Sequence, residues 1–527
     1  MSSSKKVEEN TLSFYGFIGN KNGVLKVTIV DTKTEKIVKK LSFIVKEKYE
    51  NVKVFVQNIP SIFTKNFKTV IIQLFEFETS EYPNNYQFCK VIRNYFDFIK
   101  IPYYFISGQN YLHTTLLAAS NITAKVNDYV SFVSLINDDY IVEKYQFSEN
   151  GHNFFGIGKI SSSRKPEIIK KQFLGFTNSA PKIVPFTLIF GSKNNAAAEK
   201  LQNVMPISDG FVVVDIQENG GAEIQGIVEI SKWILDNKNI KCYFLPKCCT
   251  EFLVVGKYGG KILPNVLTKL NSGLPSKNEG LFARSNIEYF EAYSTLGRDY
   301  VYLSQLHLDK NCHRYNIICN VDINNFVFYQ VKTIIIEQIK NLPTTLNKIV
   351  DSKIPVIGFP DNLSFMCICG DDGYKFVDEW NGVYGEELFI SFADEKPKYC
   401  RQAVEDCKIK PTSVIFDILK ILSMPANQIE PHLSWTFKIT KDSENPVLIE
   451  FDNFDGTKKA ASPTLLMAML LKEHLKVMKK ESGKKPKEIA FWSLDSFNAE
   501  EKKLVKNALK EACKLLKVNC SFVDIDF

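Results

Sequence analysis

One strand–helix–strand pattern occurs twice in the chain, and this repeat limits the folds that the sequence can adopt. The first copy reads TVIIQLFEF, FCKVIRNYFDFI and IPYYFIS, and the end of the chain repeats the order as KEIAFWSLD, FNAEEKKLVKNALKEACKLLKV and CSFVDID. The copies align at one constant offset, which matches Val70 with Ile489 and Tyr103 with Phe522. Because the offset spans most of the chain, the repeat is a duplicated α/β unit and not a short-period solenoid.

The composition is that of a folded protein with more than one domain. The chain has 527 residues, of which 45% are hydrophobic and 24% charged, and this length exceeds what one core serves. The start, MSSSKKVEENTLSF, has no apolar signal-peptide core, and no apolar run approaches the length of a membrane span. We therefore expect a cytoplasmic or nuclear protein, not a secreted one, with reduced cysteines and no membrane partner.

The basic residues do not indicate a nucleic-acid partner. The net charge is only +7, and acidic residues are interspersed with the basic ones. The densest basic stretch, Leu471–Glu488, has no interleaved aromatic residues, which favours a solvated helix end over a nucleic-acid surface. The cysteines and histidines of the chain do not have the sequence spacing that is typical of zinc ligands, so we expect no metal site.

Changes in pattern along the chain predict four segments. Residues 1–240 alternate strands and helices, which predicts a sheet covered by helices. Residues 241–332 are strand-rich with little helical periodicity, which predicts an all-β sandwich. Residues 333–353 predict a linker helix, and residues 354–527 return to the α/β pattern. The expected fold class is therefore α/β plus all-β.

The order of these segments resembles the heat-shock protein 70 family. IPVIGFPDNLSFMCICGDDGYKFV and PTSVIFDILKIL are similar to the start of that family's first lobe. IVPFTLIFGSKNNAAAEKLQNV is similar to its adenosine-side loop and helix, and LPKCCTEFLVVGKYGGKILPNVLTKLNSGLPSKNEGLF to the opening of its sandwich. The resemblance implies actin-like (ribonuclease H-like) ATPase lobes and a peptide-binding β-sandwich. The fuller first lobe follows the sandwich here, so it either completes the N-terminal half, as in a permuted molecule, or is a separate repeat.

The positions that match the family's phosphate loops lack the residues that hold phosphate. Residues 360–364 read PDNLS in place of the family's DLGTT, and Leu419 stands where the phosphate-positioning lysine is expected. Phosphoryl transfer depends on such groups, so we expect no catalytic residue and no required cofactor, with weak binding of ATP or ADP with Mg²⁺ left open. The residues of this vestigial nucleotide cleft are Gly16, Gly19, Ser134, Asp138, Gly191, Ser192, Pro360 and Asn362.

The resemblance implies a chaperone-like protein that binds extended peptides or a partner protein through its sandwich without hydrolysing ATP. Phe252, Leu253 and Val254 are the candidate peptide contacts, and a sandwich core strand is the alternative interpretation of the same residues. Two other functions stay open: an active ATP-dependent folding chaperone with drifted phosphate loops, and a regulatory or structural scaffold that binds no peptide.

Overall fold

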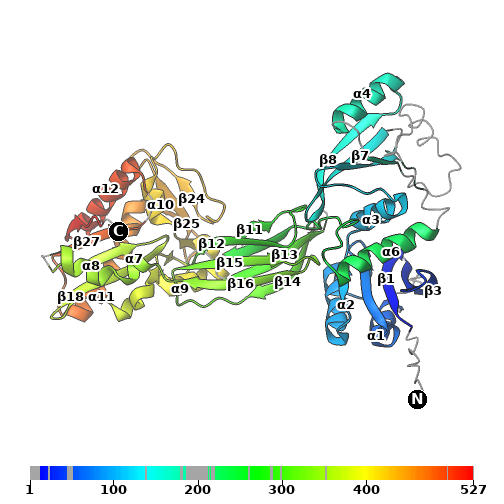
Figure 1. Cartoon of the computed structure of the whole chain (residues 1–527). Helices are drawn as coiled ribbons and strands as arrows, with labels where there is room; N and C mark the ends of the chain where they lie inside the picture. The colour runs from blue at the N-terminus through cyan, green and yellow to red at the C-terminus, as the bar shows by residue number, and fades with distance from the viewer. Residues whose placement is uncertain are drawn as a thin grey trace, which may run out of the picture. The chain divides into compact units, whose positions relative to one another are not determined.

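The computed structural model describes residues 12–21, 24–43, 51–136, 139–177, 182–185, 212, 214, 220–258, 261–284, 289–296, 299–350, 353–494 and 497–525. The chain divides into two compact units, whose elements are labelled in Figure 1. Unit 1 comprises residues 1–250, 270–276 and 321–327, and unit 2 comprises residues 251–269, 277–320 and 328–527.

The first sheet of unit 1 has five strands in the order β3-β2-β1-β4-β5. β1 pairs antiparallel with β2 and parallel with β4, and β4 pairs parallel with β5. The first predicted strand–helix–strand is therefore present, and an antiparallel hairpin of β1 and β2 precedes it. The elements are β1 Phe14–Lys21, β2 Val24–Asp31, β3 Ile37–Phe43, α1 Asn51–Ile62, β4 Phe67–Gln73, α2 Asn85–Ile99 and β5 Tyr103–Phe105.

Helices cover both faces of this sheet, as the apolar strand runs predict. α1 and α2 lie on one face, where Phe55 and Phe96 are fully buried in a shared core (Figure 1). α6, Gly220–Leu235, lies on the other face, and its Trp233 ring packs against Tyr104 with centroids 4.8 Å apart.

A second sheet in unit 1 repeats the beginning of this topology. Its order is β8-β7-β6-β9, with three antiparallel strands and β9 parallel to β6. α3 packs against α6, so the two sheets of unit 1 share a helical layer. The elements are α3 Gly108–Ser120, β6 Tyr129–Ile136, β7 Asp139–Ser148, β8 Gly151–Ser161, α4 Pro166–Thr177 and β9 Lys182–Pro185.

The sheet of the C-terminal lobe, residues 353–525, has the same order as the first sheet. Its strands run β19-β18-β17-β27-β28, with β17, β27 and β28 mutually parallel, which confirms the duplication predicted from sequence. The elements are β17 Val356–Phe359, β18 Leu363–Gly370, β19 Gly373–Phe376, α11 Pro463–Ser482, β27 Glu488–Ser493, α12 Ala499–Leu515 and β28 Asn519–Phe522.

The strand register corrects one detail of the sequence alignment. Val70 lies beside Tyr103 in the first sheet, whereas Ile489 lies beside Cys520. The counterpart of Tyr103 is therefore Cys520, and the match with Phe522 was wrong. A constant offset assumes equal lengths between the strands, and the second copy is shorter there.

Seven strands of unit 2 form two sheets of a β-sandwich. The sheets have the orders β11-β10-β13-β14 and β12-β15-β16, and Val254, Phe290 and Tyr315 are buried between them. The strands are β10 Phe252–Tyr258, β11 Lys261–Thr268, β12 Ser276–Ala283, β13 Tyr289–Leu296, β14 Asp299–Leu306, β15 Arg314–Val321 and β16 Val327–Ile334.

Short elements complete unit 2. They are α7 Glu337–Lys340, α8 Leu342–Ile349, η2 Asp378–Trp380, η3 Gly382–Tyr384, β20 Glu386–Glu387, β21 Ile390–Ser391, β22 Lys398–Tyr399, α9 Cys400–Ile409, η4 Pro411–Ser413, β23 Val414–Ile415, α10 Ile418–Ser423, β24 Lys438–Thr440, β25 Leu448–Asp452 and β26 Lys458–Ala461. Two short helices, α7 and α8, thus stand where one linker helix was predicted. Within the described ranges, every helix is too short or too polar to cross a bilayer.

Arg284 joins the sandwich to the C-terminal lobe inside unit 2. Its side chain is only 2% exposed and donates hydrogen bonds to the carbonyl oxygens of Lys310, Cys312 and Gly385. The Nε atom also lies 3.4 Å from a carboxylate oxygen of Glu387. A buried guanidinium needs such partners, because a charge without them would be very costly in the interior.

Replacing this arginine should therefore destabilise unit 2. We expect Arg284→Met to lower the free energy of unfolding by about 3–5 kcal/mol, because three carbonyl oxygens lose their donor and Glu387 loses its cation. Urea denaturation followed by circular dichroism measures the change, and Lys332→Met, at an exposed position of β16, serves as the control. Equal midpoints for the two variants would contradict this role for Arg284.

Candidate functional site

The loop that matches the first phosphate loop, residues 360–364, is occupied by contacts within the protein. Asn362 is 4% exposed, and its side-chain oxygen accepts a hydrogen bond from the backbone N–H of Asp417. Ser364 is fully buried; its hydroxyl oxygen accepts a hydrogen bond from Trp380 Nε1 and lies 2.9 Å from His474 Nε2. The Asn362 oxygen and the Ser364 hydroxyl are therefore used inside the lobe, whereas the Asn362 amide nitrogen is buried without a hydrogen-bond partner among the described residues.

An arginine of the sandwich binds the same loop from outside. Arg314 donates two hydrogen bonds to the carboxylate of Asp361, from Nε at 2.9 Å and from a terminal nitrogen at 3.0 Å. This fork geometry is the strong form of an arginine–carboxylate pair. Asp361 has a left-handed backbone, with φ of 50°, which aims the loop at the sandwich.

The position expected for the positioning lysine also belongs to the core. Leu419 is 3% exposed, whereas the neighbouring Lys420 is exposed. Asp417, at the start of α10, accepts a hydrogen bond from Trp435, and burial raises the pKa of its carboxyl group.

In unit 1, the predicted cleft residues lie in sheet strands. Gly16 is packed so closely that a Cβ there would come within 2.9 Å of the Phe63 ring, and a Cβ at Gly19 would meet the Phe17 ring. Ser134 lies in β6 opposite Ile141. These glycines therefore make room for aromatic packing. Three predicted residues lie outside the described part of the chain: Asp138, Gly191 and Ser192.

The three candidate peptide contacts on the sandwich are buried. Phe252, Leu253 and Val254 are each 0% exposed, because the sandwich core and its surroundings cover both faces of β10. Their burial is typical of a sandwich core strand, and their role as peptide contacts stays a prediction.

Exposed aromatic residues instead gather at the edge of the same sheet. Tyr300 and Tyr302 of β14 are 62% and 49% exposed, and their rings pack against Tyr293 of β13, with centroids 6.4 and 5.7 Å away. β14 ends the strand order of its sheet. The sequence DYVYLSQL contains neither lysine nor proline, the residues that usually protect an edge strand. The absence of lysine and proline from this strand is the sequence signal that could have predicted an unprotected edge at β14.

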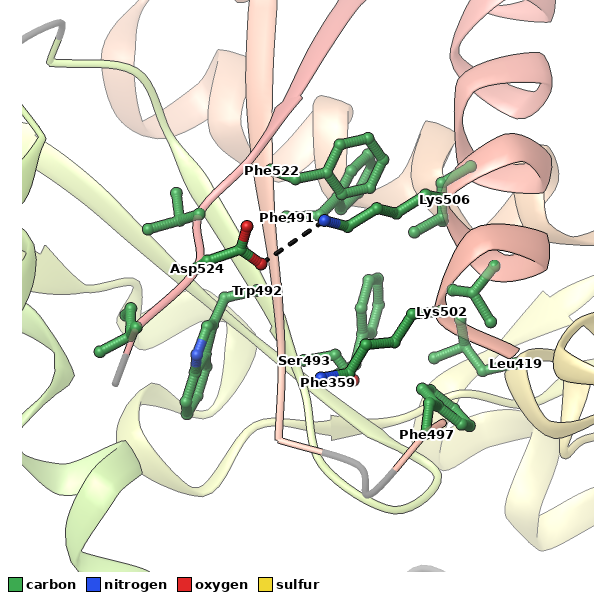
Figure 2. A pocket seen from close by; sticks show the side chains of 14 residues that line it. Phe359, Leu419, Phe491, Trp492, Ser493, Phe497, Lys502, Lys506, Phe522 and Asp524 are labelled. Carbon is green, nitrogen blue, oxygen red and sulfur yellow. Dashed lines mark hydrogen bonds and ion pairs between the residues drawn. The ribbon is translucent and has the colours of Figure 1, made fainter. Parts of the chain in front are cut away.

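A pocket of about 150 Å³ lies at the carboxyl ends of β17, β27 and β28, beside α12 (Figure 2). Phe359, Phe491 and Phe522 line it from the strands, and Lys502 and Lys506 extend toward it from α12. Open α/β sheets commonly bind ligands at the carboxyl ends of their strands. The residues that line this pocket come from separate elements, so no local sequence motif predicts it.

Unit 1 has a larger pocket, of about 380 Å³, which lies near the ends of β4 and β5 and is lined mainly by α3, β7, β8 and residues 245–249. In its wall, Glu143 lies 2.7 Å from His113 Nε2, and His113 Nδ1 lies 3.0 Å from the Tyr145 hydroxyl. The Nε2 contact is close but does not have the geometry of a hydrogen bond. Burial lowers the pKa of Lys247, which lies 3.8 Å from the centre of the Phe154 ring.

The described part of the chain offers no obvious metal ligands. No group of three or more His, Cys, Asp or Glu side chains within it could hold a metal ion. All twelve cysteines are free thiols, and burial raises the pKa of several, including Cys89 and Cys367.

His474 should make unit 2 sensitive to acid. Burial lowers its pKa from 6.5 to about 4, so the unfolded chain binds a proton more readily than the folded one between these values. Stability should therefore fall as pH drops from 6.5 toward 4, by up to about 1.4 kcal/mol per pH unit.

The measurement is the urea midpoint of unit 2, followed by tryptophan fluorescence at several pH values. His474→Gln removes the titrating group and should flatten the dependence. His307→Gln, at an exposed histidine, should leave it unchanged. An identical pH dependence in all three proteins would rule out His474 as the cause.

Comparisons with known proteins leave the family open. Neither the protein-family models nor the curated proteins match this chain.

Proposed function

We propose that this chain is a chaperone-like binding protein with actin-like (ribonuclease H-like) lobes, which holds an extended polypeptide on its β-sandwich and does not hydrolyse ATP. The repeated strand order supports the lobes: two sheets have the order of three antiparallel strands followed by two parallel ones, and a third sheet has its first four strands. The two-sheet sandwich between the α/β segments supports the resemblance further.

The edge strand β14 carries the peptide-binding part of the proposal. Among the described strands, only β13 pairs with it, so its other edge presents backbone groups to which an extended peptide can pair. Tyr300 and Tyr302 stand beside that edge and offer aromatic area to alternate side chains of the peptide. An unprotected edge of this kind promotes aggregation unless it serves binding.

The Arg314–Asp361 pair supports the part of the proposal that this protein does not hydrolyse ATP. A phosphate loop must direct backbone N–H groups, a carboxylate and a cation at the nucleotide. Here the loop's carboxylate binds the sandwich, and its buried serine and asparagine bind neighbouring residues. Peptide binding would then be independent of nucleotide.

Substitutions at the edge test the peptide site. We expect Tyr300→Lys combined with Tyr302→Lys to weaken binding of fluorescein-labelled, leucine-rich extended peptides by at least about tenfold, because two aromatic contacts are lost and charge is added to the edge. Fluorescence anisotropy measures the affinity. Phe328→Lys changes an aromatic side chain of β16 that is 53% exposed and should leave the affinity unchanged. A loss of the same size in the control would place the site elsewhere.

Calorimetry tests the nucleotide part. With Mg-ATP or Mg-ADP we expect no binding heat and no phosphate release, and peptide affinity should be equal with and without nucleotide. Micromolar nucleotide affinity with turnover would favour an ATP-dependent chaperone. Absence of both nucleotide and peptide binding would favour a structural scaffold.

A further inference from the structure

The pocket of the C-terminal lobe has an apolar inner wall and a volume that suit a small aromatic ligand. The pocket opens to solvent and has a volume of about 150 Å³. Its inner wall is apolar: Phe359 and Phe491 are buried, with near-parallel rings whose centroids are 5.8 Å apart. A void of this volume with aliphatic and aromatic walls accommodates one benzene-sized ring.

The mouth of the pocket is positively charged. Lys506 forms an ion pair with Asp524 at 3.5 Å and lies over the Phe522 ring, so its charge is partly balanced. Lys502 lies one helical turn earlier on α12, and Figure 2 shows it at the same opening. Lys502 is exposed and lines the pocket, so its ammonium group can pair with an anionic ligand at the opening.

We propose that this pocket binds a ligand that carries a carboxylate next to a single aromatic ring. The ring lies against the phenylalanine side chains of the inner wall, and the carboxylate lies at the mouth beside Lys502. This site is separate from the peptide edge at β14, and the proposal does not depend on peptide binding there.

Two sources could supply this chemistry: a free aryl carboxylic acid, or a polypeptide that ends in phenylalanine. They share the ring and the carboxylate and differ in the chain attached to them. The pocket takes one ring only, so bicyclic acids should bind more weakly than phenyl acids.

The test titrates the full chain with phenylacetate, with its uncharged counterpart phenylethanol, and with a peptide that ends in phenylalanine, followed by ligand-observed NMR and calorimetry. We expect phenylacetate to bind more tightly than phenylethanol. Lys502→Ala should weaken phenylacetate binding by about fivefold, the scale of an exposed ion pair, and leave phenylethanol unaffected. Lys503→Ala is the matched control, since Lys503 is exposed on the same helix but does not line the pocket.

A second variant fills the pocket. Val505 lines it and is 5% exposed, so Val505→Phe should abolish binding of every probe while the fold, checked by circular dichroism, is retained. If that variant does not fold, Val505→Met gives the same test with less added volume.

Each outcome of the titrations either identifies the source of the ligand or overturns the proposal. Binding of phenylacetate identifies a free acid as sufficient, and binding of the peptide alone identifies a chain terminus as the source. The proposal is overturned if no probe binds, if phenylethanol binds as tightly as phenylacetate, if Lys503→Ala matches the loss in Lys502→Ala, or if the filled pocket still binds.

Discussion

Parallel pairing between distant strands is the constraint on which each α/β sheet depends. β17 lies beside β27, although the two strands are separated by the whole C-terminal lobe in sequence, and β1 lies beside β4 in the same way. A parallel pair requires a long crossover between its strands. The crossovers supply the helices that cover the sheets, and the pairing brings the carboxyl ends of the strands together, where both main pockets lie.

The pockets near the two sheets differ in the charges and in the elements that line them. The pocket of unit 1 has Glu76 and Glu143 in its wall together with Lys247, whereas the C-terminal pocket has two lysines and Asp524. The strand order is therefore retained while the side chains at the strand ends differ.

Local sequence signals predicted the elements well, and non-local contacts escaped prediction. The hairpin of β1 and β2 follows from its apolar pattern, and the capping box of Asn498 and Glu501 is present in α12. Both depend on neighbours within a few residues. In contrast, Arg284 and Arg314 of the sandwich bind residues of the C-terminal lobe. No residue spacing in the sequence predicts these long-range contacts. The burial of Phe252, Leu253 and Val254 also depends on non-local contacts, since apolar composition alone cannot separate a core strand from a binding strand.

The irregularity in β14 has a geometric consequence for any strand that pairs with its edge. The register between β13 and β14 shifts between Ala292 and Tyr293, so the half of β14 that carries the tyrosines is regular and the remainder is offset. An incoming strand would find continuous pairing only along the regular half, because a bulge twists the edge and interrupts the ladder. Only a short peptide segment could then pair with the edge of β14. This limit would prevent further strands from adding to the bound one and extending the sheet.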